Sequence, residues 1–236
     1  MIPARYAATR FPYKLMQPLG TKTVIRHTYD NTVATGLFDE VFVVTDHEII
    51  FNEIINNGGK AVMSKRQHES GSDRIAEAVE EMDADIILNV QGDEPFVNKA
   101  PLKKLLAAFE DEKVQVASLM KKFRDIELVK NPNYVKVVVD KDNNALLFSR
   151  SVIPYQRDET MAATYYEHIG VYAFTKQALL NFTKWPAAKN EQVEKLEQLR
   201  YLENGVTIKM VETNEETVKI DVPEDLAAAE NFLRNL

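Results

Sequence analysis

Short apolar runs alternate with helical hydrophobic spacing along the first hundred residues. The runs at residues 40–45, 61–63 and 84–90 are rich in β-branched and aliphatic side chains, which predicts buried strands. Apolar positions between and after them recur at helical spacing, which predicts helices at 23–36, 47–56, 72–82 and 99–109. Strands that alternate with helices form parallel sheets covered on both faces, so this part predicts an α/β fold.

The middle of the chain has a different pattern. Residues 134–139 and 145–148 flank a polar turn at 140–144, which predicts a β-hairpin, and 165–174 reads as a further strand. We expect an antiparallel lobe, inserted at about 130–175, that receives a second substrate. The remaining segments predict strands at 115–120 and 206–211 and helices at 189–204 and 221–233.

Together these elements predict a single domain spanning 1–236, because no repeat, low-complexity stretch or flexible linker divides the chain. In the helix at 189–204, Val193, Leu196, Leu199 and Leu202 would form the inner stripe. Glu197 and Gln198 would then lie on or beside its polar face, where such residues commonly meet only water.

Composition and charge narrow the function. A net charge of -7 and a pI near 5.3 argue against a nucleic-acid partner, which requires a basic face. The absence of cysteine excludes disulfides and thiolate chemistry. The longest apolar runs have the length of strands, far short of a membrane span, and no signal peptide opens the chain, so we expect a cytoplasmic location. Only Met1 and Ile2 precede Pro3, so we also expect a clipped first strand or a natural start other than Met1.

A basic loop opens the chain. Arg5, Arg10 and Lys14 follow the first strand, and two prolines restrict the loop backbone. Open α/β sheets bind ligands at the carboxyl ends of their strands. A stiff loop with three cations there suits a triphosphate, since arginine grips phosphate oxygens and lysine adds a mobile charge. The alternative is a solvated basic loop without a ligand.

Acidic residues follow two later segments. Asp93 and Glu94 come directly after the strand at 84–90, on the same sheet edge as the basic loop. Such a pair suits Mg²⁺, which takes a few protein oxygens and completes its shell with phosphates and water. Asp93 could instead cap the helix that begins near Lys99, and Asp221 could simply start the last helix.

A polar loop at 67–74 leads into the helix at 72–82. Ser72 can cap this helix, and Asp73 favours its first turn through the helix dipole. That account leaves Gly71 and Arg74 unexplained. A glycine at this place allows the backbone to approach a base or sugar closely.

Taken in order, the motifs resemble the 3-deoxy-manno-octulosonate (Kdo) cytidylyltransferases along essentially the whole chain. They are IPARYAATRFPYK at 2–14, HESGSDR at 68–74, NVQGDEP at 89–95, NPNYVK at 131–136, FSR at 148–150, HIG at 168–170, LEQLR at 196–200 and DVPED at 221–225. Each motif is weak alone, and their order makes the resemblance specific.

The resemblance implies a nucleotide-diphospho-sugar transferase-like fold. This is a three-layer α/β/α architecture with a mostly parallel central sheet and a smaller antiparallel substrate and dimerisation lobe. It also implies a homodimer that uses Mg²⁺ and converts CTP and Kdo into CMP-Kdo and pyrophosphate for lipopolysaccharide assembly. No membrane or nucleic-acid partner is expected.

Residue by residue, the resemblance assigns catalytic, nucleotide, metal and sugar-acid roles. The catalytic set would be Arg5, Arg10, Lys14 and Asp93. The nucleotide set would be Pro3, Ala4, Arg5, Lys14, Ser70, Gly71, Arg74, Gln91 and Asp93. Asp93 and Asp221 would bind the metal. Arg157, Tyr166, His168, Glu197 and Gln198 would bind the sugar acid, with Arg157 facing its carboxylate.

Two other families and one non-catalytic class compete with this assignment. CMP-sialate synthetases carry glycines and a serine where this chain has Tyr6 to Thr9, and sugar-1-phosphate nucleotidyltransferases begin with a glycine-rich loop. A non-catalytic regulator would be expected to lose Asp93 or Asp221. Tyr13 departs from the resembled family, which usually has glycine there, and could crowd the basic loop.

Overall fold

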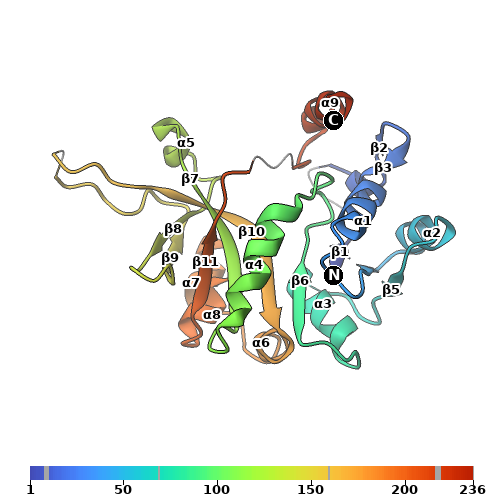
Figure 1. The fold of residues 1–236 in the computed structure, drawn as a ribbon, viewed down its shortest axis with the longest axis horizontal. Helices are drawn as coiled ribbons and strands as arrows, with labels where there is room; N and C mark the ends of the chain where they lie inside the picture. The colour runs from blue at the N-terminus through green and yellow to red at the C-terminus, as the bar shows by residue number, and fades with distance from the viewer. Residues whose placement is uncertain (8–10, 69, 159, 216–218, 236) are drawn as a thin grey trace. The chain divides into compact units, whose positions relative to one another are not determined.

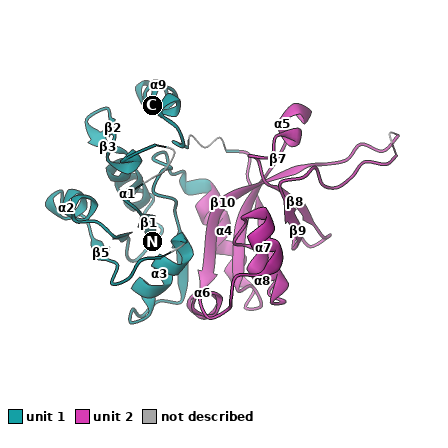
Figure 2. Cartoon of the chain, turned by 180° about the vertical axis from the view of Figure 1, so that it is seen from behind, with its two compact units in different colours: residues 1–100, 215–236 teal, residues 101–214 magenta. Residues whose placement is uncertain are grey.

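The structure is a computed structural model that describes residues 1–7, 11–68, 70–158, 160–215 and 219–235. It divides the chain into two compact units (Figure 2). Unit 1 contains residues 1–100 and 215–236, and unit 2 contains residues 101–214. The single-domain organisation with a lobe at about 130–175 stays a prediction.

Unit 1 is built on parallel strands. In its three-stranded sheet, β4 (Val43–Thr45) lies between β1 (Ile2–Ala4) and β5 (Ala61–Met63) and pairs with both in parallel. Figure 1 labels the two outer strands, β1 and β5. The strand β6 (Ile86–Asn89) runs beside β1, because Val90 N donates to Met1 O at 3.0 Å and Met1 N donates to Leu88 O at 2.8 Å. The predicted strands of the first hundred residues are therefore confirmed.

The helices of unit 1 follow the predicted alternation with the strands. Their bounds are α1 (Val24–Ala34), α2 (Glu48–Asn56), α3 (Gly71–Val79) and α9 (Pro223–Arg234), while α4 (Lys99–Ala107) begins in unit 1 and continues into unit 2. The hydrophobic pattern missed a short 3-10 helix, η1 (Lys14–Met16), and a small hairpin of β2 (Pro18–Leu19) and β3 (Lys22–Thr23). In α9 a proline occupies the first turn, as predicted.

The predicted cap of α3 was wrong by two residues. Ser70, not Ser72, caps the helix, since its Oγ accepts a hydrogen bond from Asp73 N at 3.1 Å. Ser70 has the extended backbone of an N-cap residue, whereas Ser72 lies inside the first turn and is buried. Ser70 and Ser72 both stand at the start of the helical pattern, and serine is a common N-cap residue, so the sequence alone did not separate them.

Unit 2 contains a mixed sheet whose main path runs β11-β7-β10-β8-β9. The strands are β7 (Val116–Lys122), β8 (Lys136–Val139), β9 (Ala145–Ser149), β10 (Tyr166–Thr175) and β11 (Ile208–Glu212). β11 pairs with β7 in parallel, and the pairs β7–β10, β10–β8 and β8–β9 are antiparallel. The predicted hairpin is confirmed as β8 and β9. Two helices, α5 (Ile126–Lys130) and α6 (Lys176–Phe182), were not predicted.

The predicted single helix at 189–204 was wrong. Two short helices, α7 (Lys189–Glu194) and α8 (Leu199–Glu203), are separated by residues 195–198, the first of which, Lys195, has the left-handed conformation, with φ 56° and ψ 47°. Nine residues of continuous helix would separate Glu191 from Arg200 by about 13 Å along the axis. The break instead lets Arg200 bind Glu191 with Nε–Oε2 and Nη2–Oε1 distances of 2.8 and 2.5 Å. As a result Val193, expected on the inner stripe, is 76% exposed.

Among the described residues, no helix has the length and apolar character needed to cross a membrane.

Candidate functional site

A cavity of about 320 Å³ lies in unit 1, at the carboxyl ends of β1 and β6. Its walls include all nine residues predicted to bind the nucleotide, and also Asp221. The full lining is Pro3, Ala4, Arg5, Lys14, Leu15, His68, Ser70, Gly71, Arg74, Gln91, Gly92, Asp93, Lys219 and Asp221. Arg10, the remaining predicted catalytic residue, lies outside the described residues.

Two glycines that line this cavity lie close to Pro3 of the first loop. A Cβ added to Gly92 would lie 3.0 Å from Pro3 O, and one added to Gly71 would lie 3.2 Å from Pro3 Cγ. Such contacts are tighter than side chains normally tolerate, so both glycines allow their loops to approach the first loop. The close approach seen at Gly71 is thus between two loops of the protein itself. The expected approach of its backbone to a base or sugar stays a prediction.

Two carboxylates from distant parts of the chain share one ammonium group. Lys14 Nζ lies 2.5 Å from Asp93 Oδ2 and 3.4 Å from Asp221 Oδ1. The backbone holds the two acids together as well, because Ile220 N donates to Asp93 O at 3.0 Å. The structure thus brings Asp93 and Asp221 to one point on the cavity wall.

The donor set of this point fits Mg²⁺. Two carboxylates that already share a cation are hard oxygen donors directed at one position, which is what Mg²⁺ prefers. No group of three or more His, Cys, Asp or Glu side chains among the described residues could hold a metal ion. Phosphate oxygens and water would therefore have to complete the shell of a metal bound here.

Two further charged residues lie beside this pair. Removal from water, followed by the charge of Asp93, raises the pKa of Glu94 to about 7. Burial alone would lower the pKa of Lys219, but the charges of Asp93, Asp221 and Glu94 outweigh it and raise that pKa. Lys219 was missed by the sequence reasoning, and the only available signal was its position two residues before Asp221.

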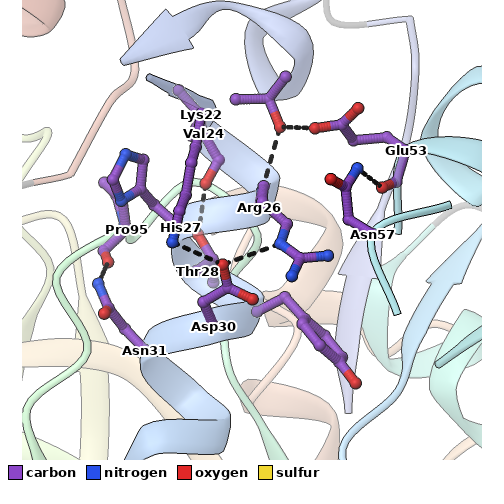
Figure 3. Close-up of polar contacts among 12 residues, drawn as sticks. Lys22, Val24, Arg26, His27, Thr28, Asp30, Asn31, Glu53, Asn57 and Pro95 are labelled. Atoms are coloured by element: carbon purple, nitrogen blue, oxygen red, sulfur yellow. Dashed lines mark hydrogen bonds and ion pairs between the residues drawn. The ribbon is translucent and has the colours of Figure 1, made fainter. Parts of the chain in front are cut away.

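Helix α1 anchors the loop that carries Asp93. Thr28 Oγ1 donates to Gly92 O at 2.9 Å, and Asn31 Nδ2 donates to Pro95 O at 2.6 Å. Figure 3 shows Asn31 of α1 directed at Pro95, with Thr28 one turn earlier on the same helix. The loop carrying Asp93 is thus held on both sides of the carboxylate.

The far wall of the cavity is organised by Arg74, which is buried. Its Nη2 lies 2.9 Å from Asp46 Oδ2, and its Nη1 donates to Ser64 Oγ at 2.9 Å. These bonds tie α3 to the residues that follow β4 and β5. Arg74 therefore braces this wall of the cavity in addition to lining it.

His68, on the same wall, is held by an acid. Its Nε2 lies 3.0 Å from Glu77 Oε2. Burial alone would raise the pKa of Glu77, but hydrogen bonds from His68, Arg66 and the Lys65 backbone lower it to about 2. Sequence reasoning gave His68 no role beyond its motif.

Unit 2 brings part of the predicted sugar-acid set together. His168 of β10 lies with Nδ1 3.4 Å from Gln198 Nε2 and Nε2 3.0 Å from Ser118 Oγ. Burial lowers the pKa of His168 to about 3, so the imidazole is neutral at physiological pH. Burial, followed by the nearby charge of Glu197, raises the pKa of Tyr172, whose ring centroid is 5.3 Å from that of His168. His168, Glu197 and Gln198 thus belong to one cluster.

Of the other two predicted sugar-acid residues, Tyr166 shares β10 with His168, and strand periodicity puts residues two positions apart on the same face of the sheet. Tyr166 lies two residues before His168 on β10 and pairs with Lys122 of β7 and Val137 of β8. Arg157 is exposed on the segment between β9 and β10, which Figure 1 shows as a long extension of unit 2. The contact of Arg157 with a sugar carboxylate stays a prediction.

Comparison with known proteins identifies the family. A family model described as Cytidylyltransferase matches residues 1–210. The chain is 57% identical to the 3-deoxy-manno-octulosonate cytidylyltransferase of Flavobacterium johnsoniae, over 100% of this chain and 98% of the relative. It is 56% identical to the protein of the same name from Christiangramia forsetii, over 99% of this chain and 95% of the relative.

Solved structures agree with this result. A structure of CMP:2-keto-3-deoxy-manno-octonic acid synthetase complexed with CTP superposes with a TM-score of 0.94 at 36% identity, covering 99% of this chain and 97% of the other. A 4-diphosphocytidyl-2C-methyl-D-erythritol synthase from Anaerococcus prevotii, 17% identical with a TM-score of 0.63, covers 99% of this chain and 98% of its own and shares the fold alone. The predicted nucleotide-sugar transferase-like α/β fold is confirmed. This chain belongs to the cytidylyltransferase family and, within it, to the 3-deoxy-manno-octulosonate cytidylyltransferases.

Proposed function

We propose that this protein transfers the cytidylyl group of CTP to Kdo, forming CMP-Kdo and pyrophosphate. One observation carries the proposal. Asp93 and Asp221 converge on Lys14 in the wall of a cavity that also contains Arg5. Cations for a triphosphate and carboxylates for its metal are the groups that nucleotidyl transfer requires.

Unit 1 would bind the nucleotide. Lys14 and Arg5 would donate to phosphate oxygens and offset the negative charge that grows on the departing pyrophosphate. Gly71 and Gln91 would flank the cytidine, with Ser70 fixing the start of α3 beside it. Holding the CTP phosphates in one orientation would supply much of the rate enhancement, since enzymes that transfer phosphoryl-type groups rely mainly on positioning and electrostatics.

Unit 2 would bind the sugar acid. His168 and Gln198 would donate to and accept from sugar hydroxyls, and Arg157 would pair with the carboxylate. The two nitrogens of the neutral His168 imidazole face Ser118 Oγ at 3.0 Å and Gln198 Nε2 at 3.4 Å, so a sugar hydroxyl that bonds His168 would replace the longer contact, the one with Gln198. The 2-hydroxyl of Kdo would attack the α-phosphorus while the bond to the pyrophosphate oxygen breaks.

Asp93 and Asp221 would hold Mg²⁺. When bound, the ion would neutralise phosphate charge and favour the attacking oxygen in its deprotonated form. From the family resemblance we also propose a homodimer and a cytoplasmic role in lipopolysaccharide assembly.

The test is a pyrophosphate-release assay that crosses four nucleoside triphosphates with Kdo, 8-amino-Kdo and sialic acid. We expect release only with CTP and Kdo or its close relative, and only with Mg²⁺ present. Asp93→Asn and Asp221→Asn should each lower kcat/KM about 10²- to 10³-fold, since each removes a charged ligand without changing shape. The matched control is Asp83→Asn, an exposed acid in the same unit that does not line the cavity.

The proposal fails if the chain releases pyrophosphate equally with every nucleotide, or if either aspartate variant retains full activity. Full activity in a chelator would contradict the role of the two carboxylates. A requirement for sialic acid in place of Kdo would overturn the sugar assignment while leaving the nucleotide site intact.

A further inference from the structure

Asp221 is held by two lysines at once. Lys219 Nζ lies 3.2 Å from Asp221 Oδ2, and Lys14 Nζ lies 3.4 Å from Asp221 Oδ1. Lys14 also contacts Asp93 Oδ2 at 2.5 Å. Three of the four oxygens of the two carboxylates therefore already face an ammonium group.

Lys219 is placed to act on the whole acidic group. It lines the same cavity as Asp93 and Asp221, and it interacts electrostatically with Asp93, Glu94 and Asp221. Its side chain is 46% exposed, so the ammonium group can leave Asp221 without a large rearrangement of the core. Lys219 is thus a partly exposed cation at the edge of the carboxylate pair.

We propose that Lys219 is a built-in counter-cation that lowers the affinity of the carboxylate pair for a divalent metal until nucleotide arrives. The inference rests on the proposed metal site of Asp93 and Asp221. A metal that binds alone must compete with the charge of Lys219 for Asp221. A bound triphosphate supplies other anionic oxygens for the lysine, so metal and nucleotide favour each other's binding.

A counter-cation and a merely structural Lys219 predict opposite changes in metal affinity when the lysine is removed. If Lys219 only orients Asp221, its removal leaves the carboxylate less ordered and weakens metal binding. If Lys219 is a counter-cation, its removal takes a repelling positive charge from the site and strengthens metal binding. The direction of the change therefore separates the two roles.

The experiment measures Mn²⁺ binding to the full chain by electron paramagnetic resonance, with and without CTP and in the absence of Kdo. Lys219→Met should bind Mn²⁺ alone about tenfold more tightly than wild type, a change typical of losing one nearby partly solvated charge. Lys219→Arg, which keeps the charge, should stay within about threefold. With CTP bound, the gain of Lys219→Met should largely disappear, so its coupling between Mn²⁺ and CTP falls about tenfold.

Lys99→Met is the matched control, because Lys99 is exposed in the same unit and does not line the cavity. Lys219→Gln provides a second neutral variant and should behave as Lys219→Met does. Unchanged or weaker Mn²⁺ binding in both neutral variants overturns the counter-cation role.

A separate variant distinguishes this failure from failure of the metal site itself. Asp221→Asn should lose tight Mn²⁺ binding in the presence of CTP. If it loses binding while the Lys219 variants show no gain, only the counter-cation inference fails. If Asp221→Asn binds Mn²⁺ as wild type does, the proposed metal site fails and the inference fails with it.

Discussion

Replacing Arg200 with methionine tests the ion pair that joins the two short helices α7 and α8. Arg200 and Glu191 are each 9% exposed, and two hydrogen bonds of 2.8 and 2.5 Å join them. The guanidinium carbon also lies 4.1 Å from the ring centroid of Phe182. This change removes the charge while keeping an unbranched apolar side chain of similar length.

The expected cost is large because it leaves a buried carboxylate without its cation. Removing one partner of a buried ion pair destabilises a protein by about 3–5 kcal/mol. Loss of the cation–π contact adds about 1 kcal/mol. Domains of this size have unfolding free energies of only about 5–15 kcal/mol, so Arg200→Met should lose about a quarter or more of the total.

Urea denaturation of four chains measures this effect: wild type, Arg200→Met, Glu191→Leu and the double variant. The double variant should be more stable than Arg200→Met by about 2 kcal/mol or more, because it buries no unpaired charge. Arg234→Met is the matched control. Its partner Glu230 lies at 3.2 Å in an exposed i,i+4 pair, so the loss should be below about 0.5 kcal/mol.

If the losses of unfolding free energy in the two single variants add up to the loss in the double variant, the reasoning is refuted. Such additivity would show that Glu191 and Arg200 do not stabilise the fold as a pair. The same variants carry a functional readout. Gln198 precedes α8 directly, and Arg200 anchors the first turn of that helix. Arg200→Met should therefore raise the KM for Kdo more than the KM for CTP.

Two further predictions address the two candidate binding sites. In the folded chain burial lowers the pKa of His168 to about 3, from 6.5 for an exposed histidine, so between these values the unfolded chain binds the extra proton and stability falls as pH drops. The advantage of wild type over His168→Asn should shrink by about 2 kcal/mol between pH 7 and pH 5 in urea denaturation, and parallel pH profiles would contradict this. Thr28→Val removes the hydroxyl bonded to Gly92 O and should cost about 1–2 kcal/mol and lower kcat several-fold, because the loop carrying Asp93 loses an anchor. Thr32→Val is its control, since Thr32 Oγ1 bonds only within α1 to Thr28 O; equal activity loss in both variants would show that the anchor has no specific role.

The regular parts of the fold could be predicted because local signals and tertiary structure agree there. The strands at Val43–Thr45 and Ala61–Met63 are apolar, β-branched runs, and α2 ends just before two glycines. The break in the helix at 189–204 could not be predicted, because the local pattern carries no sign of the ion pair, between residues nine positions apart, that accompanies the break. Hydrophobic spacing favours a continuous helix there, and only tertiary contacts override it.

In the candidate site, too, some residues could be predicted from the local sequence and others could not. Arg5, Lys14 and Asp93 could be placed together in advance, because parallel strands deliver their carboxyl ends to one edge of a sheet. Asp221 could be added only through the resemblance, since its local sequence reads as an ordinary helix start. Lys219 was missed because nothing in its local pattern distinguishes it from a solvated lysine.

The bond from Ile220 N to Asp93 O joins two main-chain atoms, so no substitution of a side chain at residue 93 or 221 removes it. The spacing between these two positions is a property of the scaffold, whichever side chains occupy them. Histidine or glutamate could therefore be substituted at the proposed metal site, at residue 93 or 221, to test whether this fixed backbone spacing supports a different metal preference.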